Sequence, residues 1–103
     1  MTRTLRAAVI GLGSMGANHA RVLSDTPGVE LVAVADANPV AVNRTIAGRP
    51  IPGFPDAVSL LRETGPDMVS IVVPTQLHEE VALQAIAAGA NVLVEKPIAA
   101  TLD

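Results

Sequence analysis

Short apolar runs alternate along the chain with segments that have helical periodicity. Four runs predict strands: Ala7 to Ile10, Val29 to Ala35, Met68 to Val73 and Asn91 to Glu95. The segments between them predict helices over about 14–24, 39–47, 57–65 and 77–88. Because strands that alternate with single helices pair in parallel through right-handed crossovers, we expect a doubly wound α/β sheet with helices on both faces.

Local signals refine the ends of these elements. Ile51 to Phe54 contains Pro52, so this stretch predicts a fifth strand that is brief and lies at a sheet edge, where a missing amide is tolerated. Asn38 and Asp56 have the character of helix N-caps. For the last predicted helix we expect Glu79 and Glu80 in the first turn. Its buried stripe is expected at Leu77, Val81, Ala85 and Ala88.

Composition narrows the class of protein. Half of the 103 residues are hydrophobic and 17% are charged, which favours a packed core over disorder. The net charge of -3 gives no basic field, so nucleic acid is not an expected partner. Cysteine is absent and the two histidines lack ligand spacing, so we expect no metal site. No apolar run approaches the ~20 residues that cross a bilayer, so we expect a soluble protein. Because the chain has no cysteine, nothing calls for an oxidising compartment, and we expect it to be cytoplasmic.

A glycine-rich turn follows the first predicted strand. Gly11, Gly13 and Gly16 match the spacing G-x-G-x-x-G between a strand and a helix. In this context the first glycine makes a tight turn, the second lets a pyrophosphate approach the backbone, and the third lets helix and strand pack closely. The amides of the first helical turn, at Ser14 and Met15, would face the phosphates. The alternative is a glycine turn with a purely structural role.

An acidic residue ends the second predicted strand. Asp36 stands about 20 residues beyond the last glycine, where a carboxylate accepts hydrogen bonds from the adenosine ribose. NAD is favoured over NADP, because a carboxylate ~4 Å from a 2′-phosphate repels it by about 4 kcal/mol per unit charge at an effective dielectric near 20. Arg44 is the cation that would weaken this preference. Alternatively, Asp36 is a solvated residue or caps the helix near Pro39.

The segments that carry candidate site residues all lie at the carboxyl edge of the predicted sheet, where ligands bind in this architecture. Besides the glycine turn and Asp36 they are Pro74-Thr75, with His78 three residues later, and Glu95-Lys96-Pro97. With these motifs the sequence resembles, over nearly its whole length, the Gfo/Idh/MocA family of glucose-fructose oxidoreductase and inositol dehydrogenase. The resemblance implies a Rossmann fold that binds a nicotinamide dinucleotide.

The resemblance also implies roles for individual residues. Lys96 would be the catalytic residue and would lie beside the nicotinamide and the substrate. The positive charge of the nicotinamide would lower the pKa of the lysine toward neutrality. Pro74, Thr75, His78 and Glu95 would contact the cofactor, with Glu95 orienting its loop. Other interpretations are an exposed loop lysine, a Thr75 that only caps a helix, and a His78 that is a polar surface residue. His19, on the first predicted helix, is expected to be structural.

Family members run to more than twice this length, so residues 1–103 are interpreted as a dinucleotide-binding domain that is incomplete at its C-terminus and lacks the substrate domain. The expected reaction is hydride transfer between NAD and a hydroxyl of a sugar, cyclitol or related polyol, with binding but no efficient turnover by this chain alone. An uncovered sheet edge predicts a homo-oligomer. The rival hypotheses are a free-standing NAD-binding sensor without catalysis and a scaffold that binds nothing.

Overall fold

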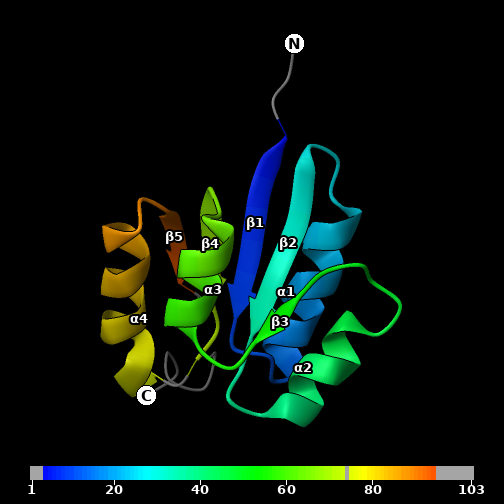
Figure 1. The fold of residues 1–103 in the computed structure, drawn as a ribbon, viewed down its shortest axis with the longest axis horizontal. Coiled ribbons are helices and arrows are strands. Elements are labelled where there is room, and N and C mark those ends of the chain that lie inside the picture. Colours follow the sequence, from blue (N-terminus) through cyan, green and yellow to red (C-terminus); the bar gives the residue numbers. More distant parts are fainter. Residues whose placement is uncertain (1–3, 74, 95–103) are drawn as a thin grey trace, which may run out of the picture.

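The computed structural model describes residues 4–73 and 75–94, without the side chains of residues 14, 75–78, 93 and 94. It is a single parallel sheet with helices on both faces (Figure 1). The strands are β1 (Leu5–Ile10), β2 (Val29–Ala35), β3 (Gly53–Phe54), β4 (Met68–Ile71) and β5 (Asn91–Val94). The helices are α1 (Ser14–Asp25), α2 (Pro39–Ile46), α3 (Ala57–Thr64) and α4 (Thr75–Ala87). The predicted fold class is therefore confirmed.

The order of the strands is β3-β2-β1-β4-β5, with parallel pairing throughout. The chain first builds outward from β1 to β3, then crosses over the sheet to β4 and builds outward in the other direction. This is the Rossmann order, and the reversal leaves a crevice beyond the carboxyl ends of β1 and β4. The predicted short edge strand is confirmed, since β3 contains two residues and, within the described ranges, pairs with β2 alone.

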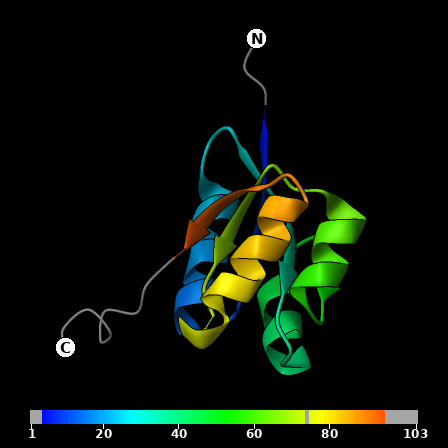
Figure 2. The same ribbon diagram turned by 90° about the vertical axis from the view of Figure 1, so that its left-hand side faces the viewer.

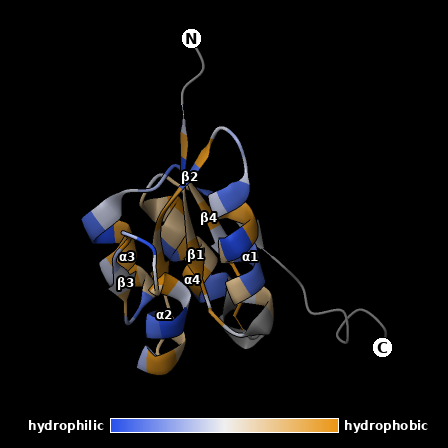
Figure 3. Cartoon of the chain, turned by 90° about the vertical axis from the view of Figure 1, so that its right-hand side faces the viewer, coloured by the Kyte–Doolittle hydropathy of each residue, from blue (hydrophilic) through white to orange (hydrophobic). Residues whose placement is uncertain are grey.

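Each face of the sheet has its own helix pair, as the edge-on view in Figure 2 shows. One core cluster joins Val9 and Val34 of the sheet to Ala20 of α1 and Val42 of α2. The other cluster packs α3 and α4 on the opposite face: Ala8, Ile10, Ala33, Ala35, Ala57, Leu60, Leu61, Val69, Ile71, Ala85 and Ala90. In Figure 3 the strands consist mainly of hydrophobic residues, whereas the helices carry both hydrophilic and hydrophobic residues.

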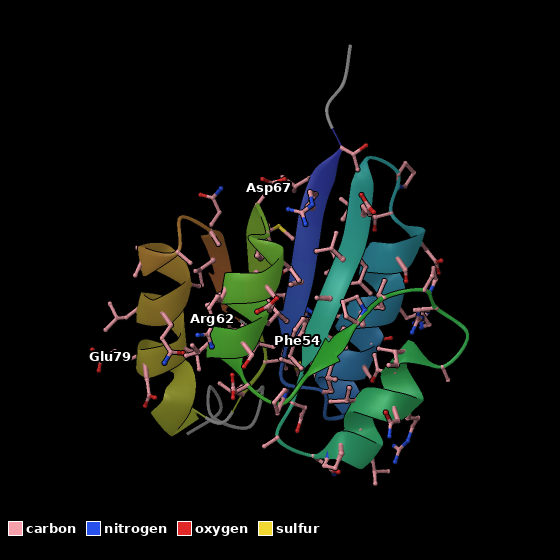
Figure 4. All side chains as sticks on the ribbon, in the orientation of Figure 1. Phe54, Arg62, Asp67 and Glu79 are labelled. Atoms are coloured by element: carbon pink, nitrogen blue, oxygen red, sulfur yellow. The ribbon has the colours of Figure 1, made fainter. Side chains whose placement is uncertain are left out.

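Small side chains dominate this core because helices must approach the sheet closely. Alanine residues on the sheet and on α4 are fully buried, and the largest fully buried side chains are those of Leu60 and Ile71. Polar side chains lie mostly at the surface, and among the described residues Thr45 and Ser70 are the buried exceptions. In Figure 4, Glu79 points away from α4, and Asp67 lies at the end of the sheet opposite the glycine turn. No helix in the described ranges has the length and apolar character that crossing a membrane requires.

Several predicted boundaries need correction. β4 ends at Ile71 and not at Val73, because its partner β1 ends at Ile10, opposite Ile71. The last helix begins at Thr75 and not near Leu77, so Glu79 and Glu80 lie beyond its first turn. In the predicted stripe of α4, Ala85 is buried, but Ala88 is exposed and lies after the end of the helix.

Candidate functional site

The carboxyl ends of β1, β2 and β4 are tied together at one edge of the sheet. The amide of Gly11 donates to the carbonyl of Ala35 over 2.8 Å, and the amide of Val72 donates to the carbonyl of Ile10, also over 2.8 Å. The segments that follow these strands therefore start from neighbouring points. They are the glycine turn, Asp36 and the chain that leads into α4.

Two of the three glycines in the turn are required by close backbone contacts. Gly11 has a φ of +99°, and a Cβ atom there would lie 2.1 Å from the carbonyl oxygen of Val72. A Cβ atom at Gly16 would lie 1.7 Å from the carbonyl oxygen of Gly11. Neither position accepts a side chain, since the opposing atoms are main-chain atoms. The predicted roles of Gly11 in the tight turn and Gly16 in close packing are confirmed.

Gly13 differs from both of its neighbours. A Cβ atom there would meet no atom within 4 Å, and its φ of -67° is open to any residue. Gly13 is also the N-cap of α1, and no side chain in the described ranges caps that helix. The turn thus presents an uncovered helix N-terminus, with its amide donors and partial positive charge, next to an open approach to the backbone. These features fit the pyrophosphate of a dinucleotide.

Asp36 is held by the backbone on both sides of the crevice. Its Oδ2 accepts a hydrogen bond from the amide of Leu12 over 2.6 Å, and its Oδ1 accepts one from the amide of Asn38 over 2.8 Å. The carboxylate therefore clamps the glycine turn to the end of β2, a role that the sequence did not predict. Each oxygen retains a further acceptor site that is suited to a ribose hydroxyl. The helix near Pro39 is capped by Asn38, as predicted, whose side chain accepts from the amide of Val40.

An open cavity of about 430 Å³ lies at this edge of the sheet. Gly13, Asp36 and Asp56 form its polar side, while Val72, Val73 and Pro55 contribute apolar walls. An adenosine needs such a combination, since apolar walls accept its base and an acceptor binds its ribose. Of the predicted residues, the structure therefore brings Gly11, Gly13 and Asp36 together around one cavity.

The other predicted cofactor contacts are described in part or not at all. Ser14 and Met15 form the first turn of α1, next to Gly13, and Thr75 and His78 belong to the first turn of α4. Thr75 is the first residue of α4, which corrects its predicted place before the helix. β5 ends at Val94, opposite Ile71, at the same edge of the sheet. Pro74, Glu95 and Lys96 lie outside the described residues.

His19 has the structural surroundings that we predicted for it. Its Nδ1 lies 2.9 Å from the hydroxyl oxygen of Ser70, a fully buried residue of β4. This hydrogen bond joins α1 to the sheet below the glycine turn. Among the residues that the structure describes, no three histidine, aspartate or glutamate side chains are grouped to hold a metal ion.

Comparison with known proteins places this geometry in context. Residues 5–103 match the model of the GFO_IDH_MocA family, described as an oxidoreductase family with an NAD-binding Rossmann fold. Inositol 2-dehydrogenase 1 of Saccharopolyspora erythraea is 39% identical over 102 residues, which are 95% of this chain and 30% of that protein. A glycosyl hydrolase family 109 protein of the same organism is 36% identical over 97% of this chain and 24% of its own length.

A solved structure has a similar fold. The scyllo-inositol dehydrogenase of Lactobacillus casei, with bound NAD(H) and scyllo-inositol, superimposes with a TM-score of 0.86 at 26% identity. The match covers 93% of this chain and 29% of that enzyme. The chain thus spans 24–30% of the length of these three proteins.

Proposed function

Because the chain belongs to the oxidoreductase family with an NAD-binding Rossmann fold, we propose that it is the cofactor-binding part of a dehydrogenase. The reaction is hydride transfer between NAD and a hydroxyl or carbonyl group of a sugar, cyclitol or related polyol. Inositol 2-dehydrogenases among the relatives support this substrate class. Since the chain spans 30% of such a relative, the activity proposed is that of the whole enzyme, to which residues 1–103 contribute the cofactor site.

The observation that carries the proposal is that the three glycines of the turn have different surroundings. Gly11 and Gly16 are closed by backbone atoms, so they shape the turn, whereas Gly13 is open. A turn with only a structural role has no need for an open glycine at the uncovered N-terminus of a helix. The open glycine, the apolar cavity and the fixed carboxylate of Asp36 lie where an extended dinucleotide would need them.

The chemistry divides between cofactor and protein. When bound, NAD supplies the hydride acceptor for oxidation of a hydroxyl group. In our proposal Asp36 accepts hydrogen bonds from the ribose hydroxyls, and the first-turn amides of α1 face the pyrophosphate. Lys96, assigned by its family motif, hydrogen-bonds the reacting hydroxyl and moves its proton. Thr75 and His78, in the first turn of α4, contribute contacts on the cofactor side.

Lys96 provides the test that separates a dehydrogenase from an NAD-binding sensor. In a full-length family member whose Glu-Lys-Pro motif matches residues 95–97, the substitution that corresponds to Lys96→Ala should reduce kcat by at least about 100-fold, as expected for loss of a proton-transferring group. The dissociation constant for NAD should change little. An unchanged kcat with a polyol substrate would refute the catalytic role and favour the sensor.

We also propose that the protein is cytoplasmic and self-associates. The net charge of -3 and the absence of cysteine agree with the first proposal. The second is supported by Leu83 and Ile86 on α4, each 60% exposed. Their substitution by polar residues should shift sedimentation toward monomer, and a strict monomer at high concentration of the unmodified chain would contradict the proposal.

A further inference from the structure

One side-chain hydrogen bond connects α1 to the middle of β4. The Nδ1 atom of His19, a half-buried side chain on α1, lies 2.9 Å from the hydroxyl oxygen of Ser70. Ser70 is fully buried and pairs with Val9 of β1, so it belongs to the centre of the sheet. Neither His19 nor Ser70 lines the cavity at the sheet edge, and the proposed chemistry uses neither of them.

A second contact holds the same side of the helix to the same stretch of chain. Gly16 lies three residues before His19 on α1 and therefore on the same side of the helix. A Cβ atom at Gly16 would lie 3.6 Å from the Cβ atom of Val72. Val72 follows Ser70 by two residues and so lies on the same face of the extended chain. The helix is thus attached to this chain at two points that are about one turn apart.

The two contacts restrain different movements of α1. The contact at Gly16 is a close approach without a preferred direction, so it limits the distance between helix and strand but not the rotation of the helix. The hydrogen bond of His19 is directional and has a narrow range of lengths. It therefore also fixes the rotation of α1 and its position along its own axis. Ser14 and Met15 form the first turn of this helix, so the direction of their amides follows from the same restraint.

The direction of these amides matters for a ligand. In the described parts of the chain, no side chain caps α1 at its N-cap residue, Gly13. The first-turn amides are therefore free to donate to a bound anion. Hydrogen bonds weaken steeply when the donor turns away from the acceptor. A small rotation of α1 would thus weaken the hold on a ligand without unfolding the helix.

We infer that His19 is a positioning residue of the cofactor site. Its hydrogen bond to Ser70 holds α1 in the orientation in which the first-turn amides face the pyrophosphate, so the dinucleotide binds more weakly when this bond is lost. The inference rests on the proposed function, because it assumes that the pyrophosphate lies at the N-terminus of α1. A role in stability alone predicts a lower Tm with an unchanged affinity for the dinucleotide. Measurements of affinity therefore separate the two roles.

The test is calorimetric titration of the 103-residue chain and its variants with NAD+, below the unfolding transition of every variant. His19→Ala and Ser70→Ala should each weaken NAD+ binding about threefold to tenfold, the range expected when one hydrogen bond to the ligand is impaired. Because both changes break the same bond, the double variant should bind NAD+ about as tightly as the weaker single variant. His19→Asn, which keeps a polar atom at the place of Nδ1, should recover part of the affinity.

Two controls separate this effect from a general loss of stability. Arg6 lies at the start of β1, whereas the glycine turn follows the end of that strand, and its guanidinium group donates to the carbonyls of Thr64 and Gly65. Arg6→Gln should lower Tm but leave the affinity for NAD+ unchanged within about twofold. Adenosine is the second control, because it has no phosphate to meet the amides. In NMR titrations it should bind His19→Ala and the unmodified chain with equal affinity.

Unchanged affinity of His19→Ala and Ser70→Ala for NAD+ would overturn the inference. An equal loss of affinity for adenosine would overturn it as well, since the site as a whole would then have loosened. If the unmodified chain does not bind NAD+, the proposed function fails, and the inference fails with it.

Discussion

Glycine occurs three times in the turn between β1 and α1, and an added methyl group would meet different surroundings at each position. At Gly16 the methyl carbon would lie 1.7 Å from a main-chain oxygen, while at Gly13 it would reach open space. Stability and cofactor binding can therefore be separated by single substitutions. A motif whose three glycines had one common role would not allow this.

We predict that Gly16→Ala lowers the free energy of unfolding by more than about 2 kcal/mol, because the clash is with backbone that cannot move aside cheaply. Gly13→Ala should lower it by less than about 1 kcal/mol, since the site is open and the change only replaces a favourable N-cap residue by a less favourable one. The same Gly13→Ala change should weaken NAD+ binding by about tenfold or more, since its methyl group occupies the approach to the pyrophosphate. Urea denaturation and calorimetric titration measure the two effects, and equal stability losses would contradict this account.

Asp56 gives a prediction about pH. The amide of Ser59 donates to its Oδ1 over 2.8 Å, and this hydrogen bond, followed by that of the Ser59 side chain and by the charge of Arg62, lowers the pKa of the carboxyl below its usual value. The folded state thus favours the ionised form. Its contribution to stability is fully present above the ordinary aspartate pKa of about 3.9 and is lost as pH falls through the lowered pKa of the folded state.

The matched variant is Asp56→Asn, which keeps a good N-cap for α3 but does not titrate. The difference in Tm between the unmodified chain and this variant should be constant from about pH 7 to pH 5 and should decrease below about pH 4. Thermal unfolding followed by circular dichroism at each pH measures it. A difference that stays constant down to pH 2 would show that the cap does not titrate with folding.

The sequence predicted residue types at this site better than their contacts. The glycine roles follow from a motif whose geometry is local, and Asp36 follows from its distance along the chain. The hydrogen bond from Leu12 to Asp36 was missed, because it depends on where β1 places the turn relative to the end of β2. Only the paired strands bring those two groups together.

At the scale of elements, the hydrogen bond between His19 and Ser70 connects α1 to the central part of the sheet. Ser70 is fully buried, so water does not easily reach its hydroxyl group. Removal of the His19 side chain therefore leaves that hydroxyl group without this hydrogen bond. An unsatisfied buried group of this kind costs about 1–3 kcal/mol. The position of α1 in turn determines where its first-turn amides lie.

We therefore predict that His19→Ala and Ser70→Ala are both destabilising and that their effects are not additive. The double variant should be more stable than the sum of the single effects implies by roughly 0.5–1.5 kcal/mol, as is usual for groups in direct contact. Urea denaturation of the four proteins gives this coupling energy. Additive effects within about 0.3 kcal/mol would show that the hydrogen bond does not couple the helix to β4.

Element boundaries were predictable where a single local signal decides them. β2 has the predicted bounds, and the caps at Asn38 and Asp56 begin α2 and α3 as expected. The start of α4 was not predicted, because Thr75 is compatible with both an N-cap and a first helical residue. The end of β4 was also missed, since it is set by the length of β1 and not by the apolar residues Val72 and Val73.

At the scale of the whole molecule, the order of the strands brings the residues of separate local motifs together in one site. Alternation of strands and helices predicted parallel pairing, and hence that the carboxyl ends meet at one edge. The cavity beside Asp36 was beyond sequence reasoning, because it depends on how far the glycine turn, the loop before α3 and the chain after β4 stand from one another. The cofactor site is a property of the whole sheet edge.

The most direct test of this account is the thermal stability of the 103-residue chain as NAD+ is added. Because a ligand that binds only the native state stabilises it, NAD+ at about 100 times its dissociation constant should raise the free energy of unfolding by about 2.7 kcal/mol, and Tm should increase with each addition. Gly13→Ala should need a higher concentration for the same increase. A Tm that is unchanged at millimolar NAD+ would contradict the central claim that this edge of the sheet binds the dinucleotide.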